Sequence, residues 1–134
     1  MSQKISKGIK DLLSDANQIV TTISFEKCKS LQKNKNFVFV DLRDYREILK
    51  DGKIPGAFSC PRGMLEFWID PDSPYHKEFF NQDKTYIFYC ASAWRSALAA
   101  KVAMEMGLSP VVHLEGGFNE WLKQGGAIET IHKK

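Results

Sequence analysis

A buried strand that continues directly into a helix, with a cysteine at the junction, is the feature that most constrains this sequence. Residues 86–89 are all apolar or aromatic, which is typical of a strand buried in a sheet. The residues from Trp94 onward favour a helix. Cys90 therefore stands near a helix N-terminus, where unpaired backbone N–H groups favour an anion. The thiolate is the reactive form of cysteine, so this position suits a nucleophile.

The loop after Cys90 consists of small residues and leads to a cation. Small residues allow a loop to curl until its N–H groups converge on one point, and a guanidinium adds a fixed positive charge. Such a thiolate can accept a phosphoryl group or a sulfane sulfur. Four residues separate Cys90 from Arg95, whereas the phosphatase signature has five, so the spacing favours sulfur transfer. The predicted substrate loop is Ala91, Ser92, Ala93, Trp94, Arg95 and Ser96.

Strands and helices alternate along the chain. The predicted strands are residues 21–24, 37–40, 57–60, 86–89 and 111–114. The predicted helices are residues 25–32, 45–50, 64–69, 75–81, 94–106 and 118–123. This order predicts an α/β fold, with a central, mostly parallel five-stranded sheet and helices on both faces. The active site of such a sheet lies beyond the carboxyl ends of its strands, where Asp41, Cys90 and Glu115 stand.

Two further segments complete the predicted organisation. Residues 1–20 have apolar side chains at spacings of three and four, and we expect them to form an amphipathic helix docked on a domain over residues 21–134. A targeting segment or a helix for a partner is the alternative. Residues 62–83 are irregular and rich in aromatic side chains, and excursions of this kind often cover a site.

Charge and cysteine content exclude several classes of function. The chain has 134 residues and a net charge of +3 without a block of Lys or Arg, which argues against a nucleic-acid surface. We also expect no membrane span, because no apolar run reaches about 20 residues. Its three cysteines fit no zinc spacing, so we expect free thiols, no metal and no cofactor. Without a secretory signal at the N-terminus, a cytoplasmic protein is expected.

Four stretches of the chain resemble the landmarks of the rhodanese family. Residues 40–43 resemble its Asp-Val-Arg strand end, and residues 51–57 its Gly-His-Ile-Pro-Gly-Ala turn. Residues 90–96 resemble the active loop Cys-x-x-Gly-x-Arg-Ser, and residues 114–118 with Trp121 resemble the closing Leu-Glu-Gly-Gly-Phe-x-x-Trp. The resemblance covers about residues 21 to 127. It implies a thiosulfate-type sulfurtransferase with the persulfide on Cys90 and the loop amides around it.

The sequence departs from the family pattern at two positions. Lys53 replaces the usual His of the turn, which is not the nucleophile. Ala93 replaces the usual glycine of the loop, and a φ above 0° at that position would cost about 1 kcal/mol for alanine. The proposed chemistry also requires a thiol that solvent can reach and loop N–H groups that point at it. The bulky Trp94 is expected to wall the pocket.

The residues around the loop have structural interpretations as well. Arg95 can shape the potential of the site, or form a structural ion pair with Asp41 or Glu115. Asp41 and Arg43 are expected to form a structural charge pair beside the crevice. Glu115 is expected to be a further supporting residue of the site. Ser96 is expected to cap the helix rather than to bind sulfur.

The remaining thiols and imidazoles receive weaker assignments. Cys60 is expected to be a core thiol, with a resolving cysteine as the alternative. His76, His113 and His132 are scattered, and none is paired with Cys90 as a base. The aromatic side chains of residues 67–80 are expected to form core or cover.

The sequence thus predicts a sulfurtransferase with a small sulfur donor, a thiol or cyanide acceptor, and a protein persulfide as a possible donor. The first alternative is a sulfur-relay or regulatory module that binds a partner and turns over small donors poorly. The second is a phosphatase or arsenate reductase on the same fold.

Overall fold

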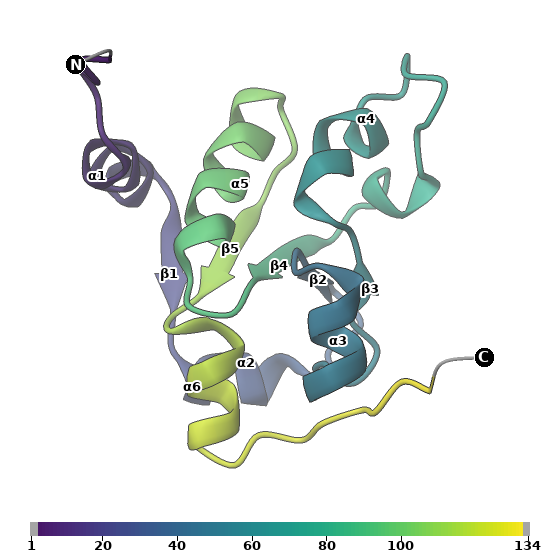
Figure 1. The fold of residues 1–134 in the computed structure, drawn as a ribbon. Helices are drawn as coiled ribbons and strands as arrows, with labels where there is room; N and C mark the ends of the chain where they lie inside the picture. The colour runs from purple at the N-terminus through teal and green to yellow at the C-terminus, as the bar shows by residue number, and fades with distance from the viewer. Residues whose placement is uncertain (1–2, 133–134) are drawn as a thin grey trace.

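Five parallel strands form the sheet at the centre of the computed structural model, which describes residues 3–132 (Figure 1). They are β1 (Thr21–Ile23), β2 (Phe37–Asp41), β3 (Phe58–Ser59), β4 (Thr85–Tyr89) and β5 (Val111–Leu114). Their order in the sheet is β1-β5-β4-β2-β3, and each neighbouring pair is parallel. The predicted parallel α/β fold is confirmed, and the carboxyl ends of the strands meet at one edge of the sheet.

Within residues 3–132, six α-helices and two short 3₁₀ helices precede, connect or follow the strands. The α-helices are α1 (Ile9–Ile19), α2 (Phe25–Leu31), α3 (Tyr45–Asp51), α4 (Leu65–Ile69), α5 (Trp94–Glu105) and α6 (Gly117–Lys123). The 3₁₀ helices are η1 (Arg62–Met64) and η2 (Glu78–Phe80). Helices α1, α4 and α5 lie on one side of the sheet, and α2 and α6 on the other (Figure 1). Within residues 3–132, none of these helices has the length and apolar character that a bilayer crossing requires.

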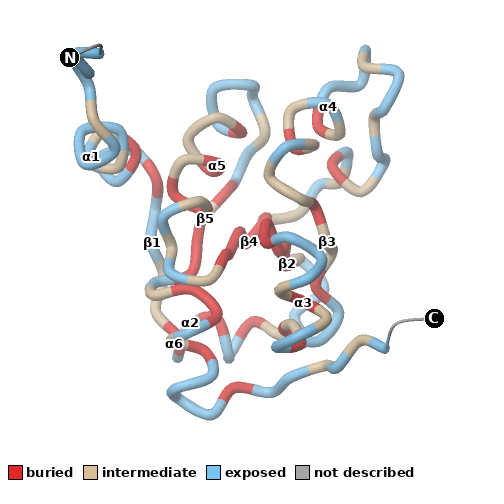
Figure 2. Tube along the Cα trace, in the orientation of Figure 1, coloured by how far each residue is buried: buried red, intermediate tan, exposed pale blue. Residues whose placement is uncertain are grey.

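Strand β4 is buried on both faces and separates two hydrophobic cores. Tyr86 and Phe88 belong to the core beneath α4 and α5, whereas Ile87 and Tyr89 belong to the core beneath α2 and α6. The alternation follows from the two-residue period of a strand. Buried residues accordingly follow β4 and β2 in Figure 2. This double burial explains why residues 86–89 are a continuous apolar run rather than an alternating one.

The N-terminal helix is shorter than predicted. Helix α1 begins at Ile9 because Gly8 is its N-cap, and the Gly8 backbone N–H donates to the Asp11 carboxylate at 3.0 Å. The helix contacts α5, with Ala16 fully buried. The predicted helix included residues 1–2 and the predicted domain included residues 133–134, and these four residues lie outside the described part of the chain.

The excursion over residues 62–83 covers a face of the sheet. The predicted helix over residues 75–81 is wrong, since only the 3₁₀ turn η2 forms there. Its Phe79 ring stacks on Phe58 with 3.9 Å between ring centroids, and its Phe80 ring stacks on Tyr86 at 5.8 Å. Both rings pack in or against the core. Just before η2, the Lys77 N–H donates to the Trp68 carbonyl rather than to a carbonyl of the same segment, so a longer helix does not form.

Arg43 is a buried cation at the carboxyl edge of β2. Its Nε and Nη2 donate to the two oxygens of Asp41 at 3.0 and 2.7 Å, and Nη2 also donates to the Gly52 carbonyl at 2.7 Å. Its guanidinium carbon lies 4.2 Å from the ring centroid of Phe118. The predicted charge pair is confirmed, with 1% of Arg43 and 0% of Asp41 exposed. The pair joins β2, the end of α3 and the first turn of α6.

Substituting Arg43→Met should strongly destabilise the fold, because it leaves the Asp41 carboxylate buried without its cation. Breaking a buried pair costs about 3–5 kcal/mol, which lowers the melting temperature of a chain of this size by roughly 10 °C or more. Thermal unfolding followed by circular dichroism measures this effect. Arg46→Met is the control, since the Arg46 side chain is 89% exposed beside Asp44. Equal losses in both variants would contradict the prediction.

Ala93 is the N-cap of α5 and has a left-handed backbone, with φ 75° and ψ 0°. The condition stated for this position, a φ above 0°, is thus present. The Cβ atom makes this conformation unfavourable for alanine. The loop therefore stores strain at the point where the chain turns from β4 into α5.

Substituting Ala93→Gly should relieve this strain and stabilise the protein by up to about 1 kcal/mol. Urea unfolding of the variant and the wild type measures the difference. Ala91→Gly in the same loop is the matched control, because Ala91 has no positive φ and the added freedom of the unfolded chain should destabilise it. The strain argument fails if Ala93→Gly is no more stable than Ala91→Gly.

Candidate active site

The loop from β4 to α5 curls back on Cys90. Cys90 follows the last residue of β4, and α5 begins at Trp94. In the first turn of α5, the Ser96 backbone N–H points at the cysteine and lies 3.3 Å from Sγ. The helix N-terminus thus donates a hydrogen bond to the sulfur, as the sequence predicts.

The first turn of α6 fixes the beginning of this loop. The Phe118 N–H donates to the Cys90 carbonyl at 2.7 Å, and the Asn119 N–H donates to the Ala91 carbonyl at 3.0 Å. Gly117 makes this approach possible, because a Cβ there would lie 2.5 Å from the Cys90 oxygen, and its φ is 63°. The Glu-Gly-Gly-Phe sequence therefore holds the backbone of the cysteine loop in place.

Arg95 pairs with Glu47, a residue that the sequence analysis missed. Its Nη1 and Nη2 donate to the two Glu47 oxygens at 2.8 and 3.0 Å, so neither expected partner, Asp41 or Glu115, holds it. These hydrogen bonds lower the pKa of Glu47 and raise that of Arg95. Glu47 also accepts a hydrogen bond from the Asp44 N–H at 2.9 Å. The capping box formed by Asp44 and Glu47 is the sequence signal that could have placed Glu47 in the first turn of α3.

Ser96 does not cap α5, contrary to expectation, because Ala93 occupies the N-cap. Its Oγ lies instead 3.0 Å from Nδ1 of His113. Nε2 of the same imidazole lies 3.0 Å from Oγ1 of Thr22 on β1. Burial lowers the pKa of His113 to about 4, so the ring is neutral at pH 7. Sequence analysis found the histidine but not its link to the loop.

The thiol of Cys90 is closed off from solvent. The residue has an exposed fraction of 0%, which corrects the expectation of an open sulfur. Of the loop amides, Ser96 N–H is the one that donates to Sγ in the described structure. The covering residues are exposed or half-buried, and the Trp94 side chain is 59% exposed at the rim. Cys90 is buried because it continues the fully buried end of β4.

Among the described residues, the other predicted residues form no hydrogen bond to the sulfur. Glu115 is exposed, and its side chain forms no ion pair within residues 3–132. Cys28 and Cys60 have exposed fractions of 0%, and burial raises the pKa of each thiol to about 12, which favours the core interpretation. No group of three or more potential metal ligands occurs in the described part of the chain.

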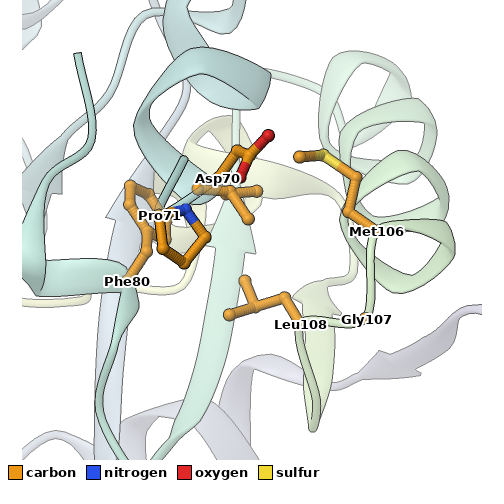
Figure 3. Close-up of a pocket in the computed structure, with 7 residues that line it drawn as sticks. Asp70, Pro71, Phe80, Met106, Gly107 and Leu108 are labelled. Atoms are coloured by element: carbon orange, nitrogen blue, oxygen red, sulfur yellow. The ribbon is translucent and has the colours of Figure 1, made fainter. Parts of the chain in front are cut away.

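A hollow of about 460 Å³ lies away from this site (Figure 3). Asp70, Pro71 and Phe80 stand on one side of it, and Met106 and Leu108 on the other. It is at the C-terminal end of α5, whereas Cys90 precedes the N-terminus. The 12-residue helix separates them by about 18 Å, so this hollow is not part of the cysteine site.

Comparison with solved structures places this geometry in a known fold. A protein of unknown function from Rhodopseudomonas palustris, described as a possible tyrosine phosphatase, is 56% identical; the match covers 96% of this chain and 99% of that one, with a TM-score of 0.94. A thiosulfate sulfurtransferase from Pseudomonas aeruginosa is 22% identical, with a TM-score of 0.76 over 94% of this chain and 23% of that one. The second likeness concerns the fold alone.

Sequence comparison identifies the family. The mouse thiosulfate sulfurtransferase/rhodanese-like domain-containing protein 3 is 30% identical over 123 residues, which cover 86% of this chain and 78% of the relative. The family model of the rhodanese-like domain matches residues 24–124, from the N-cap of α2 to the end of α6. The chain belongs to the rhodanese-like domain family.

Proposed function

We propose that the protein is a sulfurtransferase that carries a sulfane sulfur as a persulfide on Cys90. The observation that supports this most directly is the N–H of Ser96, which donates to Sγ at 3.3 Å in a loop fixed at both ends. A donor of this kind stabilises negative charge on sulfur. Membership of the rhodanese-like domain family and the short loop between Cys90 and Arg95 support the same chemistry.

The reaction has two half-reactions that balance without a redox cofactor. The Cys90 thiolate attacks the sulfane sulfur of thiosulfate, a new S–S bond forms, and sulfite leaves with the electrons of the old S–S bond. A thiol or cyanide then attacks the outer sulfur, and the cysteine leaves as a thiolate. The products are a new persulfide or thiocyanate. This order predicts ping-pong kinetics.

Arg95, the cation beside the loop, forms an ion pair with Glu47. Glu47 balances the charge of Arg95 and fixes the guanidinium at the first turn of α5. The side chains are 41% exposed for Arg95 and 34% for Glu47, so solvent weakens the pair. We therefore assign the pair mainly to loop geometry, and the stabilisation of the sulfur mainly to the Ser96 amide.

The cellular setting that suits this chemistry is a reducing compartment. Three free cysteines and an acceptor thiol are compatible with the cytoplasm, where we place the protein. Small sulfur donors and thiols are the proposed substrates, with a protein persulfide as a further donor.

A relay module is the second candidate function, and the burial of Cys90 favours it. A thiol with 0% exposure reacts with a free donor only after the loop opens, whereas a docked partner can open the loop as it binds. Slow turnover of thiosulfate combined with fast transfer from a protein persulfide would distinguish this function from the first.

A phosphatase is suggested by the description of the Rhodopseudomonas palustris protein as a possible tyrosine phosphatase. The four residues between Cys90 and Arg95 form a loop shorter than the phosphatase signature. Hydrolysis of p-nitrophenyl phosphate that disappears in Cys90→Ser would favour this activity.

Thiosulfate should add one sulfur atom to Cys90, because this thiol alone among the three receives a hydrogen bond from a helix N-terminus in the described structure. Mass spectrometry of the intact protein and its peptides measures the adduct. Cys90→Ala should show no adduct, whereas Cys28→Ala and Cys60→Ala should keep it. A sulfur on either buried core cysteine instead would contradict the site assignment.

Replacing Glu47→Gln should destabilise the protein more at pH 7 than in acid. The folded pKa of Glu47 lies below its ordinary value of 4.5, so the pair stabilises the fold above about pH 4.5 and is lost as the pH falls through the folded pKa. For a partly exposed pair we expect a difference of up to about 1 kcal/mol at pH 7 and a smaller one at an acid pH below 4.5.

Urea unfolding of wild type and Glu47→Gln at the two pH values measures this difference. Both proteins contain the other titratable groups, including His113. Their contribution to the pH dependence of the unfolding free energy is therefore the same in both proteins and drops out of the difference. A difference between the two proteins that stays constant with pH would contradict the assignment of the pair.

A further inference from the structure

A chain of polar contacts runs from β1 to the sulfur of Cys90. Oγ1 of Thr22 lies 3.0 Å from Nε2 of His113, and Nδ1 of His113 lies 3.0 Å from Oγ of Ser96. The backbone N–H of the same serine donates to Sγ at 3.3 Å. His113 and Ser96 have exposed fractions of 2% and 0%, so water does not compete for the contact between them or for the bond to the sulfur, whereas Thr22 at the outer end is exposed.

We infer that His113 is a positioning residue, which holds Ser96 so that its N–H points at the sulfur of Cys90. The inference rests on the proposed persulfide chemistry and extends it to a residue on a different strand. His113 does not contact the sulfur itself. It acts through Ser96, which lies in the first turn of α5.

The loop needs such an anchor because it contains a strained residue. The left-handed Ala93 lies three residues before Ser96, and strain of this kind persists only where the surroundings fix the backbone. The beginning of the loop is held by the amides of Phe118 and Asn119. At its end, the ion pair of Arg95 is partly exposed, whereas the contact between Ser96 and His113 is buried. The imidazole is therefore the buried anchor at the end of the loop.

The neutral imidazole suits this role better than that of a base. A neutral ring has one N–H and one acceptor nitrogen, and both nitrogens of His113 already have hydroxyl partners. Neither nitrogen is left for a proton of the substrate. The ring therefore fixes a geometry, and its expected effect is on the rate of sulfur transfer rather than on binding of the donor.

Single-turnover formation of the Cys90 persulfide tests the inference. His113→Leu removes both hydrogen bonds, and Ser96→Ala removes the hydroxyl but keeps the N–H. Each should lower the limiting rate at saturating thiosulfate about tenfold, with the thiosulfate concentration for half-maximal rate unchanged. His113→Asn, whose amide can replace Nδ1 beside Ser96, should restore the rate to within about twofold of the wild type.

The double variant separates one coupled unit from two independent effects. If His113 acts only through Ser96, the double variant should be about as slow as either single variant. Thr22→Val removes the outer contact and should have a smaller effect than His113→Leu. Thr21→Val is its matched control on the same strand, and circular dichroism checks the fold of each variant. A folded His113→Leu at the wild-type rate, or additive losses in the double variant, would overturn the inference.

The chemical shift of the Ser96 amide proton distinguishes this inference from the proposed function. It reports the N–H···S hydrogen bond without any substrate, and it should change in His113→Leu and return in His113→Asn. An unchanged shift in His113→Leu would overturn the positioning role, even where the wild type forms a persulfide. A wild type that forms no persulfide on Cys90, with the amide shift changed as expected, would refute the proposed function alone.

Discussion

The buried guanidinium of Arg43 is the constraint on which the carboxyl edge of the sheet depends. A cation with 1% exposure must have its donors satisfied, and Asp41 and the Gly52 carbonyl do this. Its position over the ring of Phe118 fixes the first turn of α6. The amides of that turn then hold the carbonyls of Cys90 and Ala91. A charge pair at the end of β2 thus determines the backbone of the cysteine loop on β4.

The cysteine loop itself combines strain with anchorage. The left-handed Ala93 lets the chain reverse sharply enough for the Ser96 N–H to reach back to the sulfur. An alanine in this conformation is held by its surroundings rather than by its own preference. The amides of α6 hold one end of the loop, and Glu47 and His113 contact the other. A glycine at position 93 would need less support from these contacts.

Much of this arrangement could be predicted from local sequence, and the rest could not. The apolar run before Cys90, the helix after it and the pair of Asp41 with Arg43 follow from strand burial and short-range spacing. The pairing of Glu47 with Arg95 and the contact of His113 with Ser96 could not be predicted, because the partners lie 48 and 17 residues apart in the sequence. Only the packing of neighbouring strands brings them together. The predicted helix over residues 75–81 is wrong because the Lys77 N–H pairs with the distant Trp68 carbonyl, while Phe79 and Phe80 pack into the core.

The closed position of Cys90 has a chemical consequence for the proposed function. Oxidation of a thiol depends on its exposure, so a sulfur with 0% exposure resists peroxide and other small oxidants while it waits for a donor. The same closure slows every substrate that cannot open the loop. Trp94, the first residue of α5, follows this loop and is 59% exposed. Under the proposed function, the loop over Cys90 would therefore decide which donors reach the sulfur.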